Sequence, residues 1–233
     1  MRVRVASCAN SRQAGMEGLA RLPKKMLGAE GELGGQAMPR VEPIIYFEDT
    51  GKTQENTRQV VETVDAFLKV HRVRHIVFAT NTGYVGAQFA PLAKRHPAVN
   101  FVAVKMAPAV DKMYGVKWNA RYGKAMEDAG IKLACGVHAL TGGVDRALRA
   151  KFEGFPPNAV IAETLYLFSQ GMKVCLEIIA MACDAGLVPE RAQVVSCAGT
   201  GHGADTAIVA TSAASANFFD MAVHRILAMP LKK

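Results

Sequence analysis

Strand-like and helix-like segments alternate along most of this 233-residue chain. From residue 43 onward, short apolar runs typical of buried strands are separated by longer segments in which apolar residues recur every three or four positions. The segment 53–72 is a clear helical example, with Val60, Val64 and Phe67 on one stripe. Regular alternation of this kind predicts an α/β fold with a mostly parallel sheet, because each helix carries the chain back across the sheet through a right-handed crossover.

The composition supports that fold class. Half of the residues are apolar, and alanine, valine and glycine are plentiful, as in parallel sheets that are covered on both faces. We therefore expect a three-layer α/β domain over residues 38–233, with helices on both faces of the sheet. The predicted strands are 43–47, 75–80, 100–106, 132–137, 192–197 and 206–212. The predicted helices are 53–72, 84–96, 118–129, 144–152, 158–169 and 172–185, with a loop at 107–117 and a C-terminal segment at 218–229.

Residues 1–37 differ from the rest of the chain. They are rich in glycine and arginine, show no hydrophobic period, and contain no apolar core of a secretory signal. Met38 stands directly before the first ordered-looking sequence. Two interpretations of 1–37 remain open, a disordered arm and a start codon that has been placed too early.

Charge and cysteine content restrict the class of partner and the compartment. The formal net charge of +8 makes nucleic acid a candidate partner, but no basic run follows one predicted helix face, and a small anionic ligand accounts for the excess as well. The longest apolar run is too short to span a membrane. Five cysteines without C-x-x-C spacing indicate reduced thiols in a cytoplasmic protein and no metal site. A homo-oligomer remains open.

Ligands of open α/β sheets bind beyond the carboxyl ends of the strands, which directs attention to the segments that follow each strand. Between the second strand and its helix, hydroxyls and free N–H groups in 80–83 converge, as in a phosphate site, although helix capping would select the same residue types. Further polar or glycine-rich segments follow the first strand at 48–53, the third at Lys105 and 107–117, the fourth at 138–143 and the fifth at 199–205. The candidate ligand-binding residues are Thr80, Asn81, Thr82, Gly83, His138, Thr141, Gly199, Thr200, Gly201 and Gly203.

The loop 199–205 has the densest glycine content in the chain. Residues 199–204 fit the dinucleotide fingerprint as letters, but that fingerprint needs a helix after the loop, and here an apolar strand-like run follows. We therefore interpret the loop as a ligand wall opposite Asn81 and Thr82, where glycines let a flat ligand approach. Asp205 is interpreted as a structural cap.

Two residues are candidates for acid–base chemistry, and each has a structural alternative. His138 follows a predicted strand, where it is equally suited to a structural hydrogen bond. Glu177 lies in an apolar helix, and a buried carboxylate there needs partners or a raised pKa. The basic and aromatic segment 105–124 is suited to a lid over an anionic ligand, to an RNA-stacking surface, or to an ordinary solvated helix face.

Residues 42–233 resemble the C-terminal α/β domain of pyruvate kinase in its stand-alone form. The most specific segments are Gly171-Met172-Lys173-Val174-Cys175-Leu176-Glu177-Ile178, Met181-Ala182-Cys183-Asp184-Ala185-Gly186, Gly203-Ala204-Asp205-Thr206-Ala207 and Asn217-Phe218-Phe219-Asp220. The resemblance implies the same three-layer α/β fold without the catalytic barrel, and hence no pyruvate kinase activity. It also implies a phosphate at residues 80–83 and flavin mononucleotide (FMN) as the ligand, with His138, Thr141 and 199–203 lining the remainder.

The leading hypothesis is a protein that binds a phosphorylated small molecule, with FMN as the specific expectation. One alternative is a sensor module for a sugar phosphate or nucleotide without chemistry of its own. Another is a flavin-dependent oxidoreductase in which His138 or Glu177 assists proton transfer. A basic RNA-binding module is the third and the least supported by the sequence.

Overall fold

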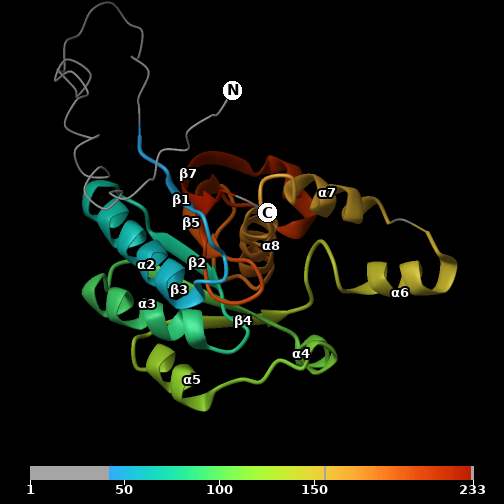
Figure 1. Cartoon of the computed structure of the whole chain (residues 1–233), viewed down its shortest axis with the longest axis horizontal. Helices are drawn as coiled ribbons and strands as arrows, with labels where there is room; N and C mark the ends of the chain where they lie inside the picture. Colours follow the sequence, from blue (N-terminus) through green and yellow to red (C-terminus); the bar gives the residue numbers. More distant parts are fainter. Residues whose placement is uncertain (1–41, 155, 232–233) are drawn as a thin grey trace, which may run out of the picture. The chain divides into compact units, whose positions relative to one another are not determined.

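Seven strands form one mixed sheet in the order β1-β7-β6-β5-β2-β3-β4. The computed structural model describes residues 42–154 and 156–231, so both interpretations of 1–37 lie outside the described residues (Figure 1). The strands are β1 (Ile45–Phe47), β2 (His75–Ala79), β3 (Asn100–Met106), β4 (Lys132–Gly136), β5 (Gln193–Ala198), β6 (Thr206–Thr211) and β7 (Ala222–Pro230). The α/β fold and the mostly parallel sheet are thereby confirmed.

Strand β6 is the exception to the parallel order. It pairs antiparallel with both β5 and β7, whereas β5, β2, β3 and β4 run parallel to one another, and β1 is parallel to β7. The connection from Ala198 to Thr206 holds no helix, and a parallel crossover needs about a dozen residues or more. The short glycine-rich loop therefore makes β6 an antiparallel neighbour of β5, and for this reason the sheet is mixed and not fully parallel.

Most helices lie where the hydrophobic period predicts them. The helices are α2 (Thr53–Val70), α3 (Tyr84–Arg95), α4 (Pro108–Tyr114), α5 (Ala120–Glu127), α6 (Val144–Phe152), α7 (Pro157–Leu165), α8 (Gln170–Asp184) and the 3₁₀-helix η3 (Ser215–Asp220). The prediction of a loop at 107–117 is wrong because α4 lies within it. Pro108 occupies the first position of α4 and Gly115 ends it in the left-handed conformation, at φ 66°, which is the usual pattern for helix ends.

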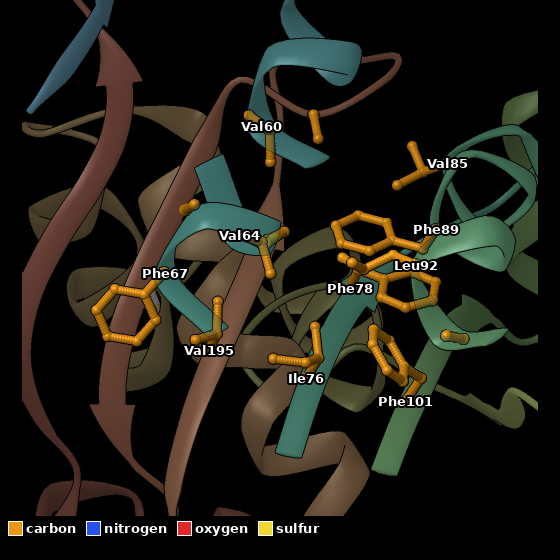
Figure 2. Packing of buried hydrophobic residues seen from close by; sticks show 14 of the residues in the cluster. Val60, Val64, Phe67, Ile76, Phe78, Val85, Phe89, Leu92, Phe101 and Val195 are labelled. Carbon is orange, nitrogen blue, oxygen red and sulfur yellow. The ribbon is translucent and has the colours of Figure 1, made fainter. Parts of the chain in front are cut away.

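Two buried clusters cover the two faces of the sheet. On one face, α2 and α3 pack over a cluster that includes Ile76 and Phe78 of β2, and Figure 2 shows Phe78 lying against Phe89 of α3. Their rings are stacked with centroids 4.5 Å apart. On the other face, α8 packs over a cluster that includes Val77, the residue between Ile76 and Phe78. The alternation along β2 follows from the two-residue period of a strand, and it explains why both faces are apolar.

Candidate functional site

A cavity of about 190 Å³ lies beside the carboxyl ends of β2, β3 and β4, between those strand ends and α8. Because the three strands are parallel neighbours, the segments that follow them leave the sheet at the same edge. Its position is the one expected for a ligand site in an open α/β sheet. The cavity is lined by Ala79, Asn81, Val104, Lys105, Met106, Tyr114, His138, Thr141, Tyr166, Lys173, Val174, Glu177, Ile178 and Met181.

A buried ion pair forms the α8 side of the cavity. The ammonium of Lys173 lies 2.6 Å from the Glu177 carboxylate, and the two side chains are 3% and 1% exposed. Their four-residue spacing places them on one face of α8. Lys173 also donates a hydrogen bond of 2.8 Å to the Thr141 hydroxyl. A buried ion pair needs such extra hydrogen bonds, because removing two charges from water costs several kcal/mol per ion.

Glu177 also holds the segment that follows β4. Its Oε1 accepts hydrogen bonds from the backbone N–H groups of Leu140, at 2.9 Å, and Thr141, at 3.2 Å. The Leu140 carbonyl in turn accepts a hydrogen bond of 2.6 Å from the side-chain amide of Asn158. Glu177 therefore satisfies one lysine and two backbone donors, and its geometry is that of an anchoring carboxylate.

A second lysine with a carboxylate partner borders the opposite side of the cavity. Lys105, at the end of β3, forms an ion pair with Asp111 of α4 and also donates to the Met106 carbonyl at 3.2 Å. Lys105 lies 5.8 Å from the ring centroid of Trp118. The other oxygen of Asp111, Oδ1, is buried and accepts no hydrogen bond from the described residues. An ammonium has three N–H donors, so Lys105 and Lys173 each retain one beyond those named here.

Aromatic hydroxyls and one imidazole complete the polar lining. Burial raises the pKa of Tyr166, and the nearby charge of Glu177 raises it further, so this phenol stays protonated and can donate a hydrogen bond. Tyr114 is half-exposed and accepts from Arg146 at 3.5 Å. His138 lies against Gly142, whose φ of 102° brings the backbone close to the imidazole.

Four of the residues singled out from the sequence meet in this cavity. Asn81, His138, Thr141 and Glu177 all line it, although they come from three separate segments of the chain. The side-chain oxygen of Asn81 accepts a hydrogen bond of 3.2 Å from the Met106 N–H. This bond fixes the end of β2 to the end of β3. The rule that directs attention to the ends of parallel strands thus brings together Asn81 and Thr141, which are 60 positions apart, and α8 adds Glu177.

The remaining residues of the 80–83 segment serve the start of α3. Thr80 is buried, and its hydroxyl accepts from the Gly86 N–H at 3.2 Å, while the Thr82 hydroxyl accepts from the Tyr84 N–H at 3.3 Å. Gly83, at φ 91°, is covered by Trp118 and Tyr122. These three residues do not line the cavity. Their hydrogen bonds are those of the capping alternative.

The glycine-rich loop lies elsewhere on the same edge of the sheet. Gly199, Thr200, Gly201 and Gly203 do not line this cavity, so their expected role as a ligand wall stays a prediction. Gly203 instead packs against the first turn of α2, where Thr57 accepts a hydrogen bond of 2.9 Å from the Ala204 N–H.

Asp205 holds this loop together. Its carboxylate accepts hydrogen bonds from the Thr200 N–H, at 2.9 Å, and from the Thr206 hydroxyl, at 2.8 Å. Gly171 of α8 approaches Asp205 and Thr206 so closely that a Cβ would clash. The structural role predicted for Asp205 agrees with these contacts.

Two charged residues of the cavity were not predicted as ligand contacts. Lys173 stands four residues before Glu177 in an apolar helix, and this spacing was the available signal that the two charges are paired. Lys105 was expected at the ligand edge after the third strand and in a basic and aromatic segment, but its partner Asp111 was not foreseen because α4 was predicted as a loop.

No family model matches this chain. Within residues 42–154 and 156–231, no helix is long and apolar enough to traverse a lipid bilayer. The same residues contain no group of three or more histidine, cysteine, aspartate or glutamate side chains that could hold a metal ion.

Proposed function

We propose that this protein binds a phosphorylated small molecule in the cavity at the carboxyl edge of β2, β3 and β4. The observation that carries the proposal is that two lysines of the lining, Lys105 paired with Asp111 and Lys173 paired with Glu177, each retain a spare N–H donor. The Glu177 carboxylate is already occupied by Lys173 and two backbone N–H groups. An entering anion therefore meets spare ammonium donors and a carboxylate whose charge is already compensated.

The polar groups around the lysines suit a phosphate. Asn81 and Thr141 line the cavity beside the two lysines, and the protonated Tyr166 supplies a further hydroxyl. A phosphate accepts several hydrogen bonds at once, and charge-assisted bonds from ammonium groups are roughly twice as strong as neutral ones. Lys105 and Lys173 would hold the charge, and the neutral donors would fix the orientation of the anion.

FMN is the specific ligand that the resemblance to the stand-alone pyruvate kinase C-terminal domain supports. Pockets for ligands of this size are about 300–1,000 Å³. The cavity of about 190 Å³ has room for the phosphate end of FMN but not for the whole flavin. The proposal therefore has two levels, with a phosphorylated small molecule as the class and FMN as the member to test first.

The experiment titrates the purified full chain by calorimetry with FMN and, as a matched ligand, riboflavin, which has the same ring system without the phosphate. We expect FMN to bind at least tenfold more tightly than riboflavin, because only FMN carries the group that the lysines recognise. A visible flavin spectrum that survives dialysis would add direct support for FMN as the resident ligand.

A wider panel separates the class from its member. Inorganic phosphate, a pentose phosphate and adenosine monophosphate are titrated in the same way. If one of these ligands binds and FMN does not, the ligand is still a phosphorylated small molecule but it is not FMN. That result would agree with a sensor module for a sugar phosphate or nucleotide. Absence of binding by every phosphorylated ligand in the panel would contradict the proposal.

A further inference from the structure

Exposed apolar side chains are frequent along the segment from α4 to residue 168. Within residues 42–154 and 156–231, ten of the sixteen large hydrophobic residues that are exposed lie between positions 113 and 168. Scattered exposed apolar residues are normal, whereas a contiguous exposed patch of several hundred Å² marks an interaction site, so the exposed residues that share one element matter most here. The ten residues are Met113, Tyr114, Leu133, Val137, Val144, Leu148, Phe152, Val160, Leu167 and Phe168.

Helix α6 contributes the most exposed part of this segment. Val144, Leu148 and Phe152 recur every four residues and therefore form one stripe, and they are 76%, 46% and 66% exposed. No residue of α6 is buried. In Figure 1, α6 (yellow) stands out from the sheet and its covering helices.

An amphipathic helix of this length needs a surface to pack on. Helix α6 has nine residues, and isolated helices shorter than about 12–15 residues are marginal in water. Most helical stability in proteins comes from tertiary packing of the apolar face. Because α6 buries none of its residues against the described part of the chain, it needs a packing surface that those residues do not supply.

The edge of the sheet offers a complementary surface. Strand β4 is the last strand of the sheet, and its Ala134 packs into the cluster beneath α8. Its neighbours Leu133 and Cys135 point to the opposite face because strand residues alternate, and both are exposed. Among the described residues, no helix covers that face of β4 in the way that α2 and α3 cover the centre of the sheet.

We propose that two copies of this chain form a two-fold symmetric dimer in which α6 of each copy covers the β4 face of the other. Each copy presents both halves of the contact, an apolar helix stripe and an uncovered strand face. A two-fold axis requires just such a self-complementary patch, and dimers of this symmetry are the commonest oligomers. A helix covering a sheet face is also the standard layer of α/β folds.

The exposed area is large enough for a stable dimer. Aromatic side chains bury about 150–250 Å² each, and the aliphatic side chains of this set are somewhat smaller. The ten residues, at 43–76% exposure, therefore present on the order of 1,000 Å². A standard interface buries roughly 800 Å² per partner. Contact of the helix stripe with the β4 face, together with its apolar surroundings, would supply such an area.

The first test measures the mass of the full chain in solution by analytical ultracentrifugation. We expect a dimer of twice 24.9 kDa, or 49.8 kDa. Leu148→Glu, on α6, and Leu133→Lys, on β4, should each weaken the dimer at least tenfold. Val70→Glu is the matched control, because Val70 is 74% exposed at the end of α2, away from both surfaces, and it should leave the dimer intact.

A mixing experiment tests the pairing itself and does not depend on how well a single variant folds. Equal amounts of the Leu148→Glu and Leu133→Lys proteins should form a heterodimer at a concentration at which each variant alone is monomeric. One of its two contacts is native, and the other joins Glu to Lys across the interface. A wild-type chain that stays monomeric at about 100 μM, or two monomeric variants that fail to associate when mixed, would overturn the proposal.

Hydrogen exchange provides a readout without substitution. Backbone amides of 144–152 should exchange slowly above the dimer dissociation constant and rapidly below it, because α6 loses its packing surface on dissociation. Amides of α8, which is buried within one copy, should exchange equally at both concentrations. Exchange of α6 that is unchanged by dissociation would also overturn the proposal.

Discussion

The Lys173 ammonium and the Glu177 carboxylate lie 2.6 Å apart on α8, and both side chains are almost completely excluded from solvent. The same carboxylate accepts backbone N–H groups from the segment that follows β4. Through these hydrogen bonds the Glu177 carboxylate joins α8 to the loop that carries Thr141. The cavity lies beside that junction. A change at either charge should affect both the stability of the fold and the shape of the cavity.

Glu177→Leu should destabilise the protein by about 3–5 kcal/mol, because it leaves the Lys173 ammonium buried without a carboxylate. Urea unfolding followed by circular dichroism measures this loss. Lys173→Met/Glu177→Leu should lose less than Glu177→Leu alone, since it buries no unpaired charge. A single variant within about 1 kcal/mol of wild type would contradict the assignment of the pair.

Asp111→Asn should tighten the binding of a phosphorylated ligand by roughly tenfold, or about 1.4 kcal/mol. Asp111 neutralises Lys105 at the cavity, and its removal frees the full charge of the lysine for the anion. Calorimetric titration compares this variant with Glu127→Gln, which removes an exposed carboxylate on α5. Equal affinities for wild type and both variants would show that Lys105 does not attract the ligand.

The pH dependence of stability should include a contribution from His75. Burial lowers the pKa of His75 below 6.5, and the positive charges of Lys132 and Arg74 lower it further. The unfolded chain therefore takes up a proton near pH 6.5 while the folded protein resists it. The contribution of neutral His75 to the free energy of unfolding is therefore fully present above pH 6.5. It is lost as the pH falls from 6.5 toward the pKa of His75 in the folded protein.

His75→Gln removes that titration and should flatten the decline. The melting temperature is measured between about pH 8 and about pH 5 for wild type, His75→Gln and the control His202→Gln, which changes an exposed histidine in the glycine-rich loop. We expect wild type and the control to lose stability in parallel and His75→Gln to lose less. Three parallel curves would exclude the role of His75.

Two glycines in the same loop should differ in their tolerance of alanine. Gly201 and Gly203 both have a positive φ, of 72° and 78°, so each alanine should cost about 1–2 kcal/mol through the backbone alone. At Gly203 the added Cβ would also clash with Thr53 and Thr57, whereas at Gly201 nothing lies within 4 Å. Gly203→Ala should therefore unfold at a lower urea concentration than Gly201→Ala. Equal midpoints would argue against close packing of the loop on α2.

The hydrophobic period and the rule for strand ends predicted the parts of this molecule that depend on local pattern. Val60 and Val64 face the core as their spacing indicates, and Asn81, His138 and Thr141 meet because parallel strands end at one edge. Pairing across distance was harder to foresee, because no local pattern connects Lys105 to Asp111 across the β3–α4 turn.

The glycine-rich loop illustrates the same limit. Its glycines indicated close approach correctly, but the approaching group is the first turn of α2, where Thr57 accepts the Ala204 N–H. A sequence shows that a backbone needs freedom at Gly203 without showing what lies against it. The antiparallel course of β6 was missed for a related reason, since strand direction depends on the length of the connection as well as on the strand itself.

The affinity of FMN for wild type, Lys105→Met and Lys124→Met tests the central claim most directly. Lys105 lines the cavity, whereas Lys124 is 66% exposed on α5 and serves as the matched lysine. We predict that Lys105→Met weakens binding at least tenfold and that Lys124→Met changes it less than twofold, with inorganic phosphate following the same order. Binding that both variants retain equally, or no binding of either ligand to wild type, would contradict a phosphate site in this cavity.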